Sequence, residues 1–334
     1  MAETYAVVQQ PSRFAETLRR SARELGILLL LVVLALFAQS KSGGSFLSHD
    51  NLVNVARLVG IYGIFSIGVS IVIITGGIDL SIGSMNAILA VVLSIWLTEK
   101  KWPPVLAIGA MMALAGALGA IHGFLITKIR LQPFIVTLCG LLIYRGLAQF
   151  IAKDETKGFS DNATFSGFAG FLKTVPLGIP IQFWILLVMA AIFWVVLHRS
   201  VYGRYLLAVG RNEEAARYSG IETKRVIGSA YVVTALMTGL GAIMLAFYTE
   251  SISPSSHGNS YELYAIAAAV LGGCSLRGGE GSIIGVVLGT VLLQVLQNLV
   301  NLLGIPSSLN LAVVGAVILI GVLADRVLNK RAYA

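Results

Sequence analysis

The chain has 334 residues, of which 57% are hydrophobic and only 12% are charged. A soluble domain carries about 25% charged residues, and the mean hydropathy here is +0.85. These values exclude an ordinary soluble enzyme and predict one membrane domain. The net charge of +8 comes from basic residues in short polar segments, which is typical of membrane topology and does not suggest a nucleic-acid partner. Cys139 and Cys274 lack metal-ligand spacing, so no metal site or disulfide framework is expected.

The apolar segments divide the chain into three parts. We predict a polar N-terminal segment 1–24, a transmembrane domain 25–325 and a C-terminal tail 326–334 in an all-α, polytopic membrane protein. No small-residue cleavage pattern follows the first apolar run, so we interpret it as a span and not as a signal peptide. Three predicted spans are short for a bilayer: 25–39, 261–276 and 309–324. The ten predicted helices cover residues 25–39, 52–74, 82–98, 104–127, 131–152, 180–198, 226–248, 261–276, 282–303 and 309–324.

Lysine and arginine are unevenly distributed between the two sets of loops. Ten spans place both termini on one side, and the segments of that side hold 16 of the 24 basic residues. The other side holds six, and Arg57 and Arg145 fall within spans. Because cytoplasmic loops carry the excess of Lys and Arg, both termini are predicted to be cytoplasmic. The pattern indicates a multi-pass membrane protein.

Two loops are longer than a tight connection: 153–179 on the outside and 199–225 on the inside. In the inside loop, Asn212 is a suitable N-cap, two glutamates fill the first turn, and Gly220 suits the position after the last turn. A compact helix is therefore predicted, either as a surface connection or as a docking element for a cytoplasmic partner. The candidate coupling residues are Asn212, Glu213, Glu214, Ala215, Ala216, Arg217 and Gly220.

Two glycine-rich segments, 75–84 and 271–282, interrupt apolar runs on the predicted cytoplasmic side. Paired glycines break helices. Asp79, the only charge between residues 58 and 98, or Ser81 can cap the next helix. The alternative is a broken helix whose polar backbone faces a transport pathway. The predicted helix breaks are Gly76, Gly77, Gly272 and Gly273.

Other polar residues lie within the apolar runs. Arg145 is expected to pair with a carboxylate or with helix-end carbonyls, or to extend towards the outer surface. His122 is expected to be a packed, hydrogen-bonded histidine. Four amides at 294, 297, 298 and 301 share one helical face, which indicates either interhelical hydrogen bonds or a weakly polar pathway. The candidate pathway residues are Asp79, Ser81, Asn86, Gln132, Gln294, Asn298 and Asn301.

Four of these segments together resemble the ribose-type sugar permease family of ABC importers. They are 76–84, 132–138 with Arg145-Gly146, 210–221, and 261–263 with 265–273, in that order. Glu214-Ala215-Ala216 followed by Gly220 resembles the cytoplasmic loop by which such permeases fit a groove on the ATPase subunit. The resemblance implies an ABC-importer permease fold, a cytoplasmic ATPase partner, a periplasmic sugar-binding protein, and a second permease chain, identical or related.

The chain contains no Gly-Lys pair and therefore no phosphate-binding P-loop. We expect no catalytic residues and no cofactor in this chain, with ATP and Mg²⁺ bound by the partner ATPase. The predicted function is thus the membrane permease of an importer for a monosaccharide or similar polyol. An ion-driven secondary transporter is the alternative, but Asp79 is the one plausible intramembrane carboxylate. A passive channel is a third possibility.

Overall fold

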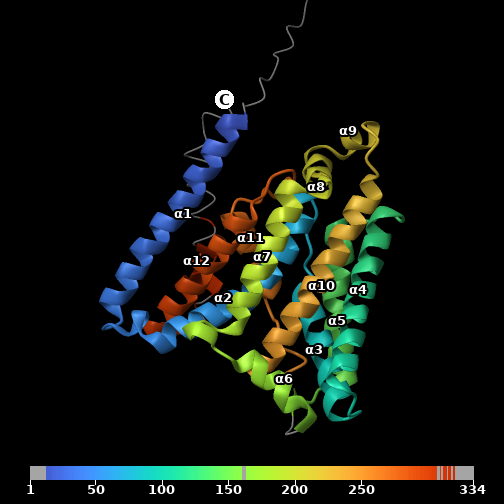
Figure 1. The fold of residues 1–334 in the computed structure, drawn as a ribbon. Helices are drawn as coiled ribbons and strands as arrows, with labels where there is room; N and C mark the ends of the chain where they lie inside the picture. The colour runs from blue at the N-terminus through green and yellow to red at the C-terminus, as the bar shows by residue number, and fades with distance from the viewer. Residues whose placement is uncertain are drawn as a thin grey trace, which may run out of the picture.

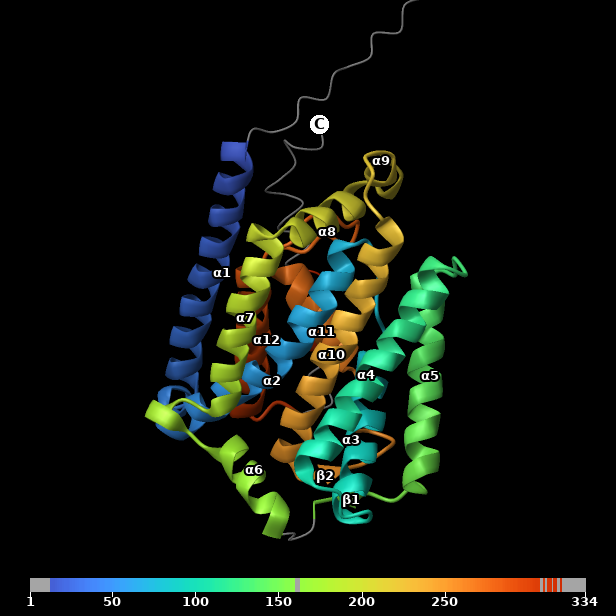
Figure 2. The same cartoon turned by 45° about the vertical axis from the view of Figure 1, so that its right-hand side comes forward.

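The computed structural model describes residues 13–159 and 163–306, and beyond them 309, 311–313, 315, 316 and 319. This part of the chain is an almost purely helical bundle (Figures 1 and 2). Its helices are α1 Arg13–Lys41, α2 His49–Ile74, α3 Ile82–Thr98, α4 Pro104–Thr127, α5 Pro133–Ala152, α6 Ala163–Lys173, α7 Ile181–Arg199, α8 Val201–Arg211, α9 Glu213–Tyr218, α10 Thr223–Thr249, α11 Tyr261–Leu271 and α12 Ile283–Leu302. Two single 3₁₀ turns, η1 Ser45–Leu47 and η2 Pro176–Gly178, and two short strands, β1 Lys157–Gly158 and β2 Ser251–Ile252, complete it.

Within the described residues, seven helices are long and apolar enough to cross a membrane: α1 from Glu24 onward, α2, α4, α5, α7, α10 and α12. Helices α3 and α11 are apolar but shorter. About four fifths of α2 and α10 is buried inside the protein, at 83% and 78% of their apolar spans. Most of the apolar surface of α4, α5 and α7 is uncovered within this chain, and such a surface requires lipid or another membrane protein to cover it. The chain is therefore an all-α, polytopic membrane protein.

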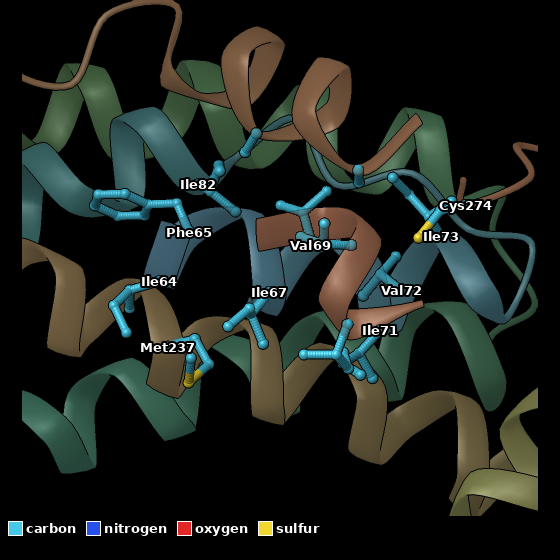
Figure 3. Close-up of a cluster of buried hydrophobic side chains, with 14 of the residues drawn as sticks. Ile64, Phe65, Ile67, Val69, Ile71, Val72, Ile73, Ile82, Met237 and Cys274 are labelled. Atoms are coloured by element: carbon cyan, nitrogen blue, oxygen red, sulfur yellow. The ribbon is translucent and has the colours of Figure 1, made fainter. Parts of the chain in front are cut away.

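The centre of the bundle is built around α2. Side chains on all sides of α2 are buried, and Ile67 and Ile71 are completely buried. Figure 3 shows them packed beside Met237 of α10, Ile82 at the start of α3, and Cys274. A helix that is apolar on all faces is covered either by protein or by lipid, and here other helices cover most of α2, so α2 lies at the centre of the bundle.

Small residues bring α4 and α10 into close contact, as the glycines in the fourth predicted span indicate. A methyl group added to Gly119 would lie 2.6 Å from the Cβ of Ala235, and one added to Gly123 would lie 2.9 Å from the carbonyl oxygen of Gly228. In lipid, such close backbone approach replaces the hydrophobic driving force between helices.

Different elements lie at the two ends of the bundle. Helices α8 and α9 lie across one end, called here the α9 end, and α1 begins at the same end (Figure 1). Strands β1 and β2 pair antiparallel at the opposite end, called here the β end, near α6 (Figure 2). There the Lys157 ammonium lies 3.1 Å from both Glu99 and Glu155, whose carboxylates accept its hydrogen bonds and raise the pKa of Lys157. Lys157 therefore stays charged at neutral pH.

Helix boundaries agree closely with the predictions for 82–98 and 104–127. Helix α1 is longer than the predicted span 25–39 because its helical backbone starts at Arg13, in a polar stretch. Helix α11 is shorter than 261–276, because the chain leaves the helix at the glycine pair that follows Leu271. Helices α6 and α8 were not predicted, since neither is a membrane span. The predicted span 309–324 and the tail 326–334 fall largely or wholly outside the described residues, as do positions 1–12.

Candidate functional site: the α9 end and a buried polar cluster

Helix α9 forms as the capping pattern predicts. The Asn212 side chain accepts a hydrogen bond of 2.9 Å from the amide of Ala215, and Gly220 adopts a left-handed φ of +85° after the last turn. Thr223 at the start of α10 donates to the Glu213 carboxylate at 3.0 Å, which ties the two helices together. Ala216 is buried against the bundle, whereas the side chains of Glu214 and Arg217 are 79% and 55% exposed. One face of α9 is therefore anchored and the other is free to contact a partner.

Loss of the cap should loosen α9 specifically. Asn212→Ala removes the acceptor for the Ala215 amide, and such a loss costs about 0.5–2 kcal/mol of helix stability. We expect faster amide hydrogen exchange over 213–218 with unchanged exchange in α2 and α10. Asn212→Asp, which keeps an acceptor oxygen, is the control and should exchange like the wild type. Equal exchange in Asn212→Ala and wild type would contradict the assignment of the cap.

Helix α8 connects α9 to the bundle. Ser200 caps it by accepting from the Gly203 amide at 3.1 Å, and Leu206 and Val209 are buried beneath it. The helix is amphipathic, and its apolar face lies on the bundle while Arg204 is exposed. The inside loop predicted as a single capped helix thus contains two helices, because α8 carries too few consecutive apolar residues to register as a span.

The end of α8 meets both predicted helix breaks at one point, called here the glycine junction and formed by Gly76, Gly210, Gly278 and Gly279. The Gly279 amide donates to the carbonyl of Ile74 at 2.9 Å. A methyl group added to Gly210 would collide with the backbone of Ile74 and Gly279. One added to Gly278 would lie 2.8 Å from the amide of Gly76. Segments distant in sequence therefore approach one another mainly through main-chain atoms, with the Arg211 side chain beside Gly279, and both breaks lie at the α9 end as predicted.

The other glycines of the two breaks serve local packing. A methyl group added to Gly77 would lie 2.5 Å from the hydroxyl oxygen of Tyr231, so this glycine leaves space for a buried tyrosine of α10. Gly272 has no room for a side chain because the backbone of Gly285 passes directly beside it, and Gly273 has a φ of +103°. These positions turn the chain out of α2 and α11.

A cleft of about 910 Å³ opens between α9, the first break and the ends of α4, α5 and α10. Gln132 of the predicted pathway lies on its wall, together with Gly76, Gly77 and Tyr231. The rim carries Glu213, Glu214 and Glu222 beside Lys128, Arg130, Arg217, Lys224 and Arg225. The coupling residues and the first break thus border one cleft.

Asp79 and Ser81 follow the glycine pair of the first break, and both are buried. One carboxylate oxygen of Asp79 accepts from the Ser81 amide at 2.9 Å and from its hydroxyl at 2.7 Å. Ser81 occupies the N-cap position of α3, but neither side chain caps that helix. The prediction of a side-chain cap is therefore wrong: Asp79 instead closes a local turn, since its nearest donors belong to Ser81.

His122 of α4 is hydrogen-bonded and packed, as expected. Its Nε2 lies 2.8 Å from the hydroxyl of Tyr144 on α5, and the two rings stack. It is 2% exposed. This pair links α4 to α5 beside the Asp79 turn.

The amide stripe on α12 divides into separate environments. Asn298 forms two side-chain hydrogen bonds with Asn51 of α2, at 3.1 and 2.7 Å, which is the interhelical alternative. Gln294 is 2% exposed and its carbonyl oxygen has no hydrogen-bond partner in the described structure. Asn301 is exposed at the end of the helix. The stripe therefore does not form one continuous polar surface.

Arg145 of α5 contacts the backbone carbonyls of a loop, whereas the sequence alternatives named a carboxylate, helix-end carbonyls or extension towards the surface. Its Nη1 donates to the carbonyls of Pro254 at 3.0 Å and His257 at 2.8 Å, in the loop before α11. The fully buried Asn86 of α3 and the buried Glu262 of α11 lie against the same loop. Neither His257 nor Glu262 was among the predicted site residues. His257 lies in a loop without an apolar or glycine-pair signal, and Glu262 lies at the start of the predicted span 261–276.

Comparison with known proteins finds a matching family and several similar permeases. Residues 51–322 match the model of the branched-chain amino acid transport system / permease component family. The chain is 37% identical to the ribose import permease RbsC of Escherichia coli K12, over 91% of this chain and 93% of that protein.

The chain belongs to this family of ABC transporter permeases. It is also 37% identical to RbsC of Bacillus subtilis, over 95% of this chain and 96% of that protein. A D-allose permease of E. coli is 31% identical over 90% of this chain and 91% of that protein. No solved structure matches the chain. Because the family match covers α2 to α12, both breaks, the glycine junction and α9 are all parts of the permease domain.

Proposed function

We propose that this permease is the membrane subunit of an ATP-driven importer that takes up a monosaccharide or a similar small polyol. The observation that carries the proposal is the connection from α9 through α8 to both helix breaks. A partner that moves α9 would move the glycine junction, because close main-chain contacts of Gly76, Gly210 and Gly278 hold the junction together. The chain itself hydrolyses no ATP in this proposal.

The proposed partners follow from this arrangement. Cytoplasmic ABC ATPase subunits bind ATP and Mg²⁺ and contact the exposed face of α9. A periplasmic binding protein delivers sugar at the β end, and a second permease copy, identical or related, completes the pathway. The chain lies in the bacterial inner membrane with both termini in the cytoplasm, so that segment 1–24, loop 199–225 and tail 326–334 share one side. No nucleic acid takes part.

A sugar is favoured over an ion as the substrate. Relatives of this chain are named as permeases for ribose, D-allose and L-arabinose. The buried polar side chains of the described residues include amides, hydroxyls and the tyrosines Tyr144 and Tyr231, and the half-buried rings of Tyr62 and Tyr261 lie tilted to each other with centroids 4.5 Å apart. Such groups bind neutral hydroxylated ligands. Asp79 is committed to its hydrogen bonds with Ser81 and is poorly placed to bind a coupling ion.

The proposal is tested by uptake of radiolabelled D-ribose, D-allose and L-arabinose in cells that express the chain with its ATPase and binding protein. We expect uptake of at least one sugar that stops when ATP is depleted and persists when the proton gradient alone is collapsed. Affinity purification from the same cells should yield a P-loop ATPase. Uptake that survives ATP depletion would contradict the proposal and favour a secondary transporter or a channel.

A further inference from the structure

Helix α11 is too short to cross the bilayer. Its 11 residues span about 16 Å at 1.5 Å per residue, against a hydrocarbon core of about 30 Å. The last residue of α11 leads directly into the second break at the α9 end. The first residue, Tyr261, therefore lies near the middle of the membrane, and segment 253–260 descends to that depth from strand β2 at the β end.

Non-helical backbone at membrane depth is stable only where protein or an enclosed polar cavity surrounds it. Arg145 supplies part of that protection, since one of its nitrogens donates to two carbonyls of the segment, those of Pro254 and His257. Glu262 in the first turn of α11 is 9% exposed and lies close enough to Arg145 for their opposite charges to interact. The arginine and the glutamate together leave no net charge.

Three polar atoms beside this segment have no hydrogen-bond partner within the described structure. They are both side-chain polar atoms of Asn86, which is 0% exposed, and Nε2 of His257, which is 7% exposed. Buried polar groups are normally paired. Because an amide and an imidazole in the same buried region both lack partners, their hydrogen-bonding capacity points to a ligand that this conformation does not hold.

The contact between α3 and the segment is made by glycines. A methyl group on Gly258 would lie 2.6 Å from the Asn86 amide nitrogen, and Gly83 leaves room for the Glu262 carboxylate. The side chains of Asn86 and Glu262 therefore each lie directly against a glycine, so no bulky side chain stands between the segment and α3 at these two points. Separation would expose Asn86, His257 and Glu262 to the space between them.

We propose that Asn86, Arg145, His257 and Glu262 form a binding site for hydroxyl groups of the transported sugar at the middle of the membrane. An amide offers a donor and an acceptor, the imidazole one further polar atom, the carboxylate acceptors and the guanidinium donors. That combination matches adjacent hydroxyls, each of which both donates and accepts. The balanced charge of Arg145 and Glu262 suits a neutral ligand over an ion. This inference rests on the proposed function, since it names the substrate contacts of that importer.

The test compares D-ribose with 2-deoxy-D-ribose and other monodeoxy pentoses in cells expressing the complete importer at saturating sugar. Asn86→Leu, which has a similar volume but no polar atoms, should lower the maximal uptake rate for D-ribose about tenfold, the factor that corresponds to 1.4 kcal/mol. For the deoxy sugar whose missing hydroxyl is the partner of Asn86, variant and wild type should transport at equal rates. Purely structural damage would slow all sugars alike.

Asn54→Leu is the matched control, because Asn54 accepts a single hydrogen bond from Tyr248 near the surface of α2 and lies outside the cluster. It should transport every sugar at the wild-type rate. A second measurement uses His257→Cys in a chain with Cys139 and Cys274 replaced by serine. D-Ribose with the loaded binding protein and ATP should slow alkylation of that cysteine, and omission of the sugar should restore the rate.

The outcomes separate the two proposals. If the wild type imports a sugar but Asn86→Leu lowers the rates of all sugars equally, or not at all, and D-ribose gives His257→Cys no protection, the binding site is refuted while the importer stands. If the wild type imports none of the sugars although an ATPase copurifies, the sugar assignment of the proposed function fails instead.

Discussion

Replacing Glu214 with lysine is expected to abolish ATP-driven uptake while the protein still inserts into the membrane. Glu214 lies in the first turn of α9 with its side chain 79% exposed, and its single described ion pair is a long contact of 3.8 Å with Arg217. An exposed ion pair of this kind contributes about 0–1 kcal/mol, so the fold should tolerate its loss. The substitution instead reverses the charge of the surface that we propose binds the ATPase.

The measurement is ATPase activity of the purified importer, stimulated by loaded binding protein, together with sugar uptake. Both should fall to background in Glu214→Lys, with normal amounts of permease in the membrane. Glu155→Lys makes the same charge change at the β end, where the side chain is 67% exposed, and should still copurify with the ATPase, a readout that does not involve the binding protein. Normal uptake by Glu214→Lys would remove α9 as the point of coupling.

Gly210→Ala is expected to have the largest effect on stability. Alanine is a better helix former than glycine by about 1 kcal/mol, so helix propensity alone predicts stabilisation of α8. The added methyl group would, however, collide with the carbonyl of Ile74 and the amide of Gly279, and these two groups are hydrogen-bonded to each other at 2.9 Å. Inserting atoms into such a contact costs about 1–3 kcal/mol or more. We therefore expect a lower melting temperature and loss of coupling.

Gly109→Ala is the matched control. Gly109 is also a helical glycine, in α4, but no atom lies within 4 Å of an added methyl group. This variant should melt at or above the wild-type temperature in detergent and transport normally. If Gly210→Ala behaved in the same way, the glycine junction would not be the tight backbone contact described here.

The helices of the bundle could be predicted where turn signals flank an apolar run. Span 82–98 follows a glycine pair, and span 104–127 begins at Pro104 and ends before Lys128, so hydropathy and chain-breaking residues agree. Helix α8 has no such signal, because it is amphipathic and lies across the end of the bundle. The short length of α11 could not be predicted either, because an apolar sequence does not show at what depth in the membrane its helix begins.

The candidate site was predictable in its local parts and not in its long-range contacts. The Asn212 cap and the left-handed Gly220 follow from residue types at fixed spacing. The approach of Gly210 to Gly279, or of Arg145 to the loop before α11, depends on how elements distant in sequence pack together. The cluster of Asn86, His257 and Glu262 therefore became visible only in the folded chain.

The glycine junction has a consequence for how such a transporter can evolve, because substrate selectivity and coupling can change independently. Its contacts are made mainly by main-chain atoms, whereas the groups that we propose bind the sugar are side chains. In the proposed importer, mutations that alter substrate selectivity can then accumulate near the middle of the membrane without weakening the coupling between α9 and the helix breaks. In the proposed importer, sugar selectivity can therefore change while the contacts that transmit the motion of the ATPase stay the same.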